Sequence, residues 1–217
     1  MQLSEQDFHQ RFKTGKLRIA FIGMSNIGKS YTANRLAKPH GFERIEVDNL
    51  IWQSLGYRSM AELATWQGQP YEAGYAEREA KSIELDSQAL NTAMDHAQSR
   101  SVGNVIIDTP GSVIYTAKTA LERLKSEFLI VHIKAGPNDI ERLKQDYFEN
   151  PKPLVWAGHY KANKNLSEQE NILACYPDLL ASRAKHYAEL SDITLDSGFI
   201  INPDLSPEAI FTKISKG

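Results

Sequence analysis

Residues 17–31 read LRIAFIGMSNIGKSY, and this stretch decides the fold class. Leu17–Ile22 is a short, mostly apolar run with the size and β-forming content of a buried strand. Gly23–Ser30 follows directly, fits the pattern G-x-x-x-x-G-K-[ST], and leads into residues with helix-forming content. A strand, a glycine-rich loop and a helix in this order predict a loop whose backbone N–H groups surround phosphate oxygens.

The loop predicts a bound nucleotide and a magnesium ion. Lys29 is expected to reach the β and γ phosphates, and the Ser30 hydroxyl to bind Mg²⁺. We expect ATP as the nucleotide. The residues expected to contact it in and next to the loop are Gly23, Ser25, Asn26, Ile27, Gly28, Lys29, Ser30 and Tyr31.

Strand and helix patterns alternate along the rest of the chain. Further strands are expected at 42–47, 104–108, 128–133 and 193–195. Helices are expected at 29–38, 49–67 (two short ones), 71–99, 113–125, 139–148, 166–190 (with a break near Pro177) and 207–215. This alternation predicts an α/β P-loop three-layer sandwich, with a parallel sheet of about five strands and helices on both faces.

The chain is expected to form a single P-loop kinase-like domain over residues 1–217. Residues 1–16 are interpreted as a short polar helix or arm. Residues 150–166 contain two prolines, several lysines and no clear period, so they are expected to form a mobile lid.

Composition excludes several classes of protein. The 25 Lys and Arg against 27 Asp and Glu give a net charge of −2, so no basic face for nucleic acid is indicated. The single cysteine, Cys175, excludes a disulfide-stapled scaffold and is interpreted as a small buried residue. No apolar run approaches the roughly 20 residues of a membrane span. We expect a cytoplasmic protein, a monomer or weak dimer, that binds neither nucleic acid nor membrane.

The loop alone leaves two reactions open. Asp108–Gly111 fits D-x-x-G, which favours a GTP-binding switch, but the nearest string to the guanine-reading N-K-x-D, residues 163–166, lacks the aspartate. A small-molecule kinase needs a carboxylate for the acceptor hydroxyl and cations around the transferred phosphoryl group. Asp48, at the end of the second expected strand, is the candidate carboxylate; its alternative role is a helix N-cap.

Other charged residues extend the candidate site. Asp108, at the end of a strand, is expected to position Mg²⁺ or water, with a turn carboxylate as the alternative. Glu46 is a candidate outer partner of the metal. Arg183 is expected to bind an acidic acceptor or a phosphate, or else to form a surface ion pair. Lys152 is either a phosphate contact or a solvated charge of the lid.

These motifs resemble those of the shikimate kinase family, within the P-loop kinases. The resemblance runs from about residue 17 to residue 215. Its most specific parts are the loop and 183–192, which follows R-x-x-x-Y-x-E-x-A-D closely. The stretch 46–48 stands where the family has D-x-D, which implies a metal-assisting Glu46 and a hydroxyl-engaging Asp48. Residues 109–112 match the family's glycine-rich turn, and 152–154 its lid motif R-P-L.

The resemblance implies an ATP- and Mg²⁺-dependent kinase for a hydroxyl of a small metabolite. The family's substrate-binding arginine falls on Ala76, which cannot form a bidentate pair with a carboxylate. Arg78 lies two residues further on. Shikimate is therefore not established as the acceptor by the motifs. A catalytically silent nucleotide-binding protein derived from a kinase is a third hypothesis.

Overall fold

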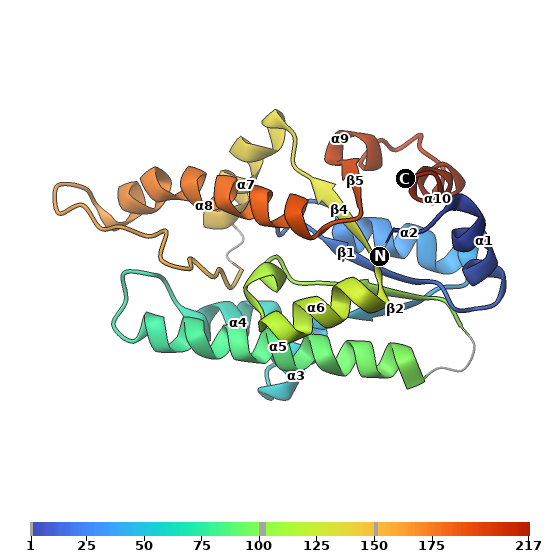
Figure 1. Cartoon of the computed structure of the whole chain (residues 1–217). Helices are drawn as coiled ribbons and strands as arrows, with labels where there is room; N and C mark the ends of the chain where they lie inside the picture. The colour runs from blue at the N-terminus through green and yellow to red at the C-terminus, as the bar shows by residue number, and fades with distance from the viewer. Residues whose placement is uncertain (1, 100–102, 150–151) are drawn as a thin grey trace.

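The computed structural model describes residues 2–99, 103–149 and 152–217. Within them, five strands form one parallel sheet in the order β2-β3-β1-β4-β5 (Figure 1). The strands are β1 (Arg18–Ile22), β2 (Glu43–Glu46), β3 (Val105–Asp108), β4 (Leu129–Lys134) and β5 (Ile193–Asp196). The predicted α/β class with a five-stranded parallel sheet is confirmed.

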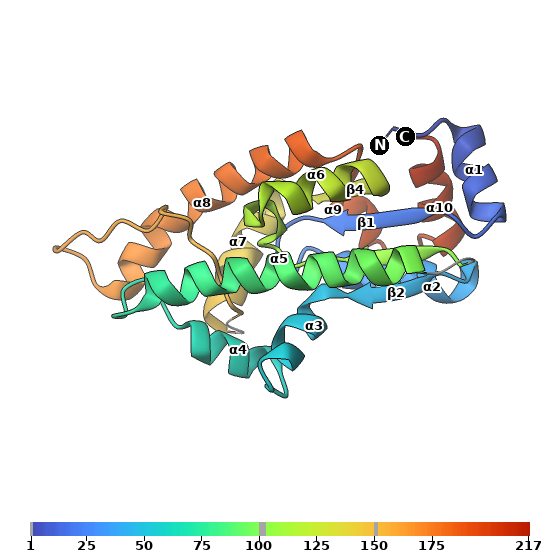
Figure 2. The ribbon, with the colours of Figure 1, turned by 60° about the horizontal axis from the view of Figure 1, so that its bottom comes forward.

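Helices cover both faces of the sheet, as buried parallel strands require. Their bounds are α1 (Glu5–Lys13), α2 (Lys29–His40), α3 (Val47–Ser54), α4 (Met60–Gln67), α5 (Tyr75–Ser99), the 3₁₀ turn η1 (Val113–Tyr115), α6 (Lys118–Glu127), α7 (Pro137–Glu149), α8 (Glu168–Leu190), α9 (Ser197–Ile200) and α10 (Pro207–Ser215). Figure 2 shows α5, α6 and α8 in front of the sheet, with α2 and α10 behind it. This is the expected three-layer arrangement.

The register brings the carboxyl ends of three strands together. Phe21 of β1 and Glu46 of β2 both pair with Asp108 of β3. Every residue of β1 is buried. The loop after β1 and the polar residues that end β2 and β3 therefore share one edge of the sheet, where open α/β sheets bind ligands.

Two helices continue past prolines that were expected to end or break them. Helix α2 continues through Pro39 to His40 and ends at Gly41, which adopts a φ of 67°. Helix α8 is continuous through Pro177. A proline removes one backbone hydrogen bond to the residue four positions earlier. The residue four positions before Pro177 is Leu173, which is exposed on the surface of α8.

The N-terminal segment is a packed helix. Phe8 of α1 is buried, and its ring centroid lies 5.2 Å from that of Phe211 in α10. Figures 1 and 2 show both chain ends on this side of the molecule.

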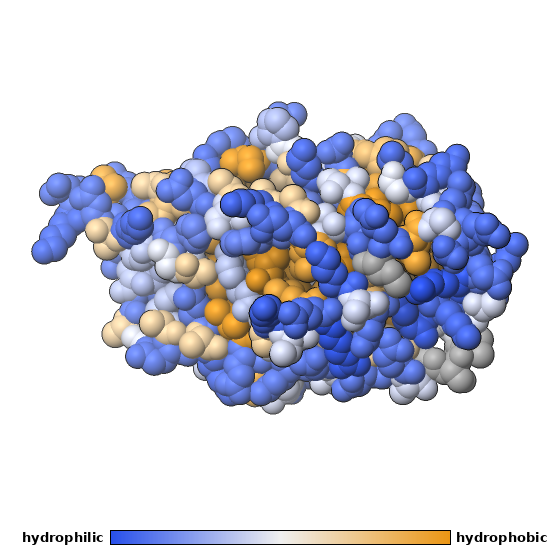
Figure 3. Space-filling model, in the orientation of Figure 1, coloured by the Kyte–Doolittle hydropathy of each residue, from blue (hydrophilic) through white to orange (hydrophobic). Residues whose placement is uncertain are grey.

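Polar side chains cover most of the face in Figure 3, with apolar ones at its centre, between α8 and the α5–α6 pair. Among the described residues, no helix combines the length and apolarity needed to cross a membrane.

Candidate active site

The loop between β1 and α2 has a backbone that only particular residues permit. Gly23 has a φ of 142°, and a Cβ there would lie 2.6 Å from the backbone oxygen of Ile133. Gly28 has a φ of 106° and precedes the first residue of α2. Asn26 also has a positive φ, of 62°, which asparagine tolerates better than most residues. The loop therefore passes close to β4 and opens α2 with its N–H groups free for an anion.

Lys29 lies inside this loop. Its Nζ donates to the backbone oxygens of Gly23 (2.9 Å) and Met24 (2.8 Å), and the side chain is buried. Burial lowers the pKa of Lys29 to about 8, although the nearby Asp108 and Asp48 oppose that shift. The ammonium group is thus held at the loop by weak neutral acceptors that a phosphate can replace.

A cleft in front of the loop gathers most of the residues predicted to bind the nucleotide. We call it the nucleotide cleft; its lining residues are Ser25, Asn26, Gly28, Lys29, Ser30, Tyr31, Asp48, Asp108, Thr109 and Lys152. The side chain of Ile27 packs in the hydrophobic core, so only its backbone can face a ligand. Four of the charged residues predicted for the site, Lys29, Asp48, Asp108 and Lys152, thus line one cavity, from α2, α3, β3 and the segment after α7, whereas Glu46 and Arg183 do not line it.

Glu46 and Asp108 lie side by side, as their register requires, but a cation joins them. Nη2 of Arg44 is 2.9 Å from Oε2 of Glu46 and 2.6 Å from Oδ2 of Asp108. Asp108 is buried. Arg44 was not predicted as a site residue, although its alternation with Glu46 along β2 places both on the same face of the sheet.

Asp48 is placed by the first turn of α3. The helix begins at Val47 with Glu46 as its N-cap, so the alternative role of Asp48 as the N-cap is wrong. Burial raises the pKa of Asp48 to about 6, and the positive charge of Lys29 opposes that shift. Asp48 lines the nucleotide cleft and also a second cavity beside it.

We call this second cavity the inner pocket. The space in it that a water molecule can occupy is about 30 Å³. Its lining side chains must therefore move apart before a small ligand can enter. Its polar lining residues are Ser25, Asp48, Gln67, Ser82, Asp86, Ser112, Lys152 and Arg183. Because Asp48 and Lys152 line both cavities, a ligand of the inner pocket would lie next to a nucleotide in the cleft.

Asp86 is a buried carboxylate that sequence reasoning missed. It lies on α5, 5% exposed, and accepts a hydrogen bond from the Ser112 hydroxyl. Burial raises its pKa to about 7. Its signal in the sequence is an acidic residue on the apolar face of a long helix, one residue from Leu85 and three from Ala89.

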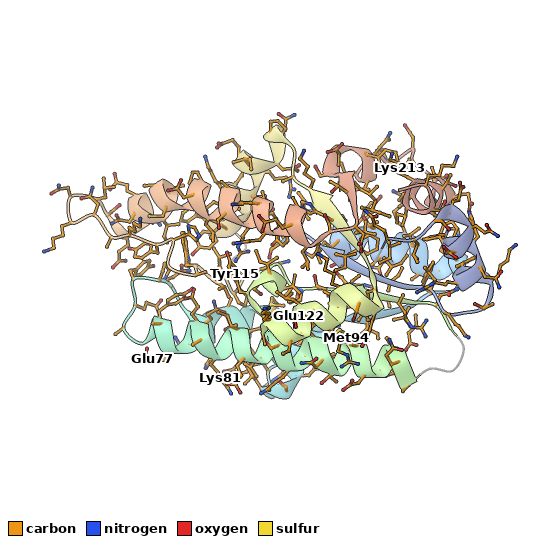
Figure 4. The ribbon with its side chains drawn as sticks, viewed as in Figure 1. Glu77, Lys81, Met94, Tyr115, Glu122 and Lys213 are labelled. Atoms are coloured by element: carbon orange, nitrogen blue, oxygen red, sulfur yellow. The ribbon has the colours of Figure 1, made fainter. Side chains whose placement is uncertain are left out.

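Arg183 lies in the interior rather than in a surface ion pair. It is 2% exposed; Nη2 donates to the Val155 oxygen (2.7 Å) and Nη1 to the Gly111 oxygen (3.4 Å). Tyr187, one helical turn along α8, also donates to the Gly111 oxygen. The ring centroid of Tyr115, labelled in Figure 4, lies 5.4 Å from the guanidinium carbon. The R-x-x-x-Y motif thus anchors the turn after β3.

Position 76 does not face the inner pocket. Ala76 is exposed at the start of α5. Arg78 does not replace the missing arginine there, because its Nε donates to the Gln67 oxygen (2.8 Å) and its Nη2 to Glu72 (3.1 Å). Arg78 instead ties α5 to the preceding loop.

The segment after α7 is anchored at its start. Glu79 accepts hydrogen bonds at Oε1 from the backbone nitrogens of Trp156 (2.5 Å) and Ala157 (3.1 Å), and Trp156 is buried. Residues 152–166 form no helix or strand, as expected, and 152–155 line the inner pocket or its neighbours. Their mobility stays a prediction; residues 150 and 151 of the predicted lid lie outside the described residues.

The donor set near the loop fits magnesium. Mg²⁺ binds oxygen ligands and is commonly held by one or two carboxylates together with substrate phosphates. Ser30, Asp108 and Glu46 supply one hydroxyl and two carboxylates, with Arg44 as a competing cation. In the described part of the chain, no group of three or more His, Cys, Asp and Glu side chains could hold a metal by itself.

Comparisons with known proteins agree with this architecture. No family model matches the chain. Shikimate kinase 2 of Sodalis glossinidius (strain morsitans) is 22% identical over 176 residues, which cover 81% of this chain and 84% of that protein. The crystal structure of shikimate kinase from Bacteroides thetaiotaomicron is 18% identical, covers 92% of this chain and 95% of its own, and superposes with a TM-score of 0.58.

A second solved structure gives the same result. Shikimate kinase from Acinetobacter baumannii, in complex with shikimate, is 20% identical, with 84% of this chain and 85% of that chain covered and a TM-score of 0.56. The chain has the fold of the P-loop kinases. Within that class, it is similar to the shikimate kinases in both sequence and fold.

Proposed function

We propose that this protein is a kinase that transfers the γ-phosphoryl group of ATP, with Mg²⁺, to a hydroxyl of a small metabolite. The observation that carries the proposal is the position of Asp48. It lies between the nucleotide cleft and the inner pocket, and so within reach of both substrates. A carboxylate there can orient the acceptor hydroxyl toward the phosphoryl group.

Each residue of the site has a proposed role in the transfer of the phosphoryl group. The loop amides and Lys29 bind the β and γ phosphates, and Lys152 and Arg183 offset charge as the phosphoryl group moves. Asp48 accepts the hydroxyl proton while the acceptor oxygen bonds to phosphorus and the bond to the β-phosphate oxygen breaks. Ser30, Asp108 and Glu46 would hold Mg²⁺, which neutralises phosphate charge when bound. The lining of the nucleotide cleft supports these roles for Lys29, Ser30, Asp48, Asp108 and Lys152, and Arg183 lines the adjoining inner pocket.

ATP-dependent release of ADP tests the proposal. The purified protein is assayed with Mg²⁺ and ATP, with and without a panel of small alcohols and hydroxy acids. We expect acceptor-dependent ADP release that falls about 10²–10³-fold in Lys29→Met. Lys125→Met, a change at a helix position remote from the loop, is the matched control.

Two results would contradict it. Tight binding of ATP with no acceptor-dependent turnover would favour the catalytically silent nucleotide-binding protein. A preference for GTP over ATP in competition binding would favour the GTP-binding switch, which Asp108–Gly111 also resembles.

A further inference from the structure

The turn after β3 packs directly against the phosphate loop, residues Gly23–Ser30. A Cβ added at Gly111 would lie 2.7 Å from Oγ and 3.0 Å from the backbone nitrogen of Ser25. This approach is closer than a side chain permits, so it requires a glycine. Because the two backbones are in contact at this point, a displacement of the turn must also displace the loop.

The carbonyl oxygen of Gly111 is held by α8. It accepts a hydrogen bond from the Tyr187 hydroxyl and a longer one, of 3.4 Å, from Nη1 of Arg183. Tyr187 is fully buried, and its ring centroid lies 5.2 Å from that of the buried His132 in β4, so packing fixes the position of the hydroxyl. Since the bond from Arg183 is long, we expect Tyr187 to provide most of the restraint on this carbonyl.

Ser25 lies at the boundary between the two cavities of the site. Like Asp48 and Lys152, it lines both the nucleotide cleft and the inner pocket. With ATP in the cleft and an acceptor in the pocket, the γ-phosphoryl group must lie at this boundary to be transferred. The backbone nitrogen of Ser25 also belongs to a loop whose N–H groups surround phosphate oxygens. The position of Ser25 should therefore affect the γ-phosphoryl group more than the other two phosphates.

We infer that Tyr187 is a positioning residue for the phosphate loop: its hydroxyl holds the Gly111 carbonyl, Gly111 holds Ser25, and the position of Ser25 sets the affinity for the γ-phosphoryl group. This inference rests on the proposed kinase function. Tyr187 is not among the residues that line the nucleotide cleft or the inner pocket, so its effect on the nucleotide passes through Gly111.

Tyr187→Phe tests this role, because it removes the hydroxyl and keeps the buried ring. Ser112 keeps its hydrogen bond to Asp86 in this variant, so the turn stays folded while the Gly111 carbonyl is released. The Kd values of ATP and of ADP, each with Mg²⁺, are measured by calorimetry. We expect the Kd of ATP to rise about fivefold, which corresponds to one neutral hydrogen bond, and the Kd of ADP to rise less than about twofold.

Tyr75→Phe is the matched control. Tyr75 is also buried, and its hydroxyl also donates to a backbone oxygen, that of Leu154 (2.6 Å). Both substitutions remove a buried hydrogen bond to a carbonyl, so both are expected to lower Tm. The ratio of the two Kd values should change only in Tyr187→Phe, because a loss of stability alone weakens the binding of ATP and ADP alike.

A second substitution tests the contact between the turn and the loop. Gly111→Ala places a methyl group against Ser25 and should raise the Kd of ATP by about tenfold relative to that of ADP, because the backbone of Ser25 has to move. Gly198→Ala is its control, since a Cβ at this exposed glycine has no other atom within 4 Å. The ratio of the Kd values should stay unchanged in Gly198→Ala.

Each of the other outcomes is decisive. An unchanged ratio of Kd values in Tyr187→Phe, whether or not both constants rise together, overturns the positioning role and leaves the kinase function standing. An unchanged ratio in Gly111→Ala, in a variant whose circular dichroism matches the original, overturns the contact as the link to the nucleotide. If the original protein binds neither nucleotide, the kinase function fails and the inference fails with it.

Discussion

Nη2 of Arg44 lies 2.6 Å from Oδ2 of Asp108, and this contact joins the carboxyl ends of β2 and β3. The same nitrogen is 2.9 Å from Glu46, so one guanidinium neutralises both carboxylates predicted to assist the metal. Without a cation, two carboxylates paired across neighbouring strands would repel. Arg44 and a divalent cation are therefore expected to compete for the same oxygens.

Arg44→Gln should make the protein depend on the metal. Loss of the guanidinium leaves Asp108 buried without its partner, and we expect the free energy of unfolding to fall by about 2–3 kcal/mol in the absence of Mg²⁺. Millimolar Mg²⁺ should restore part of that loss by binding the freed carboxylates. Thermal unfolding of both proteins with and without Mg²⁺ measures this.

The control for this experiment is Arg123→Gln. Arg123 pairs with Asp95 and Glu127 on the helix surface, so its loss should cost less than about 1 kcal/mol and respond to Mg²⁺ as the original protein does. Equal Mg²⁺-dependent shifts in Tm for Arg44→Gln and the original protein would mean that Arg44 and the metal do not share a site.

Glu79→Gln should loosen the segment after α7. The neutral amide accepts more weakly from the nitrogens of Trp156 and Ala157 than the carboxylate does, and the expected loss is about 1–2 kcal/mol. Hydrogen–deuterium exchange should quicken at these two amides. Glu77, labelled in Figure 4 on the same helix, is exposed, and Glu77→Gln should leave the exchange unchanged. Equal exchange in both variants would refute the anchoring role.

Asp86 should make stability depend on pH. Burial raises its folded pKa to about 7, above its ordinary value of 3.8, so the folded state binds the proton more tightly than the unfolded state. Its contribution to stability is then full below about pH 4 and is lost as the pH rises through about 7. Asp86→Asn cannot titrate. Its unfolding free energy relative to the original protein should rise by on the order of 2–4 kcal/mol between pH 4 and pH 8.

Urea unfolding at several pH values between 4 and 8 measures that difference. Asp95→Asn, which removes an exposed carboxylate from the same helix, should show a nearly constant difference over this range. A constant difference for Asp86→Asn would mean that burial does not perturb the Asp86 carboxyl.

Arg183→Lys should destabilise the turn after β3. Lysine keeps the charge but cannot donate in both directions to the Val155 and Gly111 oxygens. The Gly111 oxygen keeps its hydrogen bond from Tyr187, so the larger cost comes from a Val155 oxygen left without its donor. We expect a loss of about 2–3 kcal/mol in urea unfolding. Arg123→Lys, at a partly exposed position, should lose less than about 1 kcal/mol. Equal losses of unfolding free energy in the two variants would mean that the hydrogen bonds of the Arg183 guanidinium do not stabilise the turn.

Much of the fold could be predicted because its signals are local. Leu17–Ile22 and the later apolar runs at 104–108 and 128–133 each mark a buried strand, whereas the edge strands β2 and β5 are only partly buried. The helical stretches between the strands require parallel pairing. The errors at Pro39 and Pro177 arose because a proline removes one helical hydrogen bond without always ending the helix, and the packing around it decides which happens. That packing is a property of the folded molecule.

The residues of the candidate site that could be predicted are those that have a local signal in the sequence. Lys29 and Ser30 follow from the loop pattern, and Asp48 and Asp108 from their positions at strand ends. Asp86 and Arg44 were missed, because nothing local distinguishes them from an acid on a helix or a base on a strand. Their importance comes from neighbours 26 and 64 positions away, Ser112 and Asp108.

The sequence by itself determined the phosphate loop, the order of strands and helices, and the resemblance to the shikimate kinases, since each of these depends on residues close together in the chain. Only the tertiary structure decided that Ala76 lies outside the inner pocket, that backbone oxygens accept hydrogen bonds from Arg183, and that Asp86 lines the pocket beside it. The physical reason is that a pocket's charge and free hydrogen-bonding capacity depend on which groups packing has already paired, and that pairing joins distant parts of the chain.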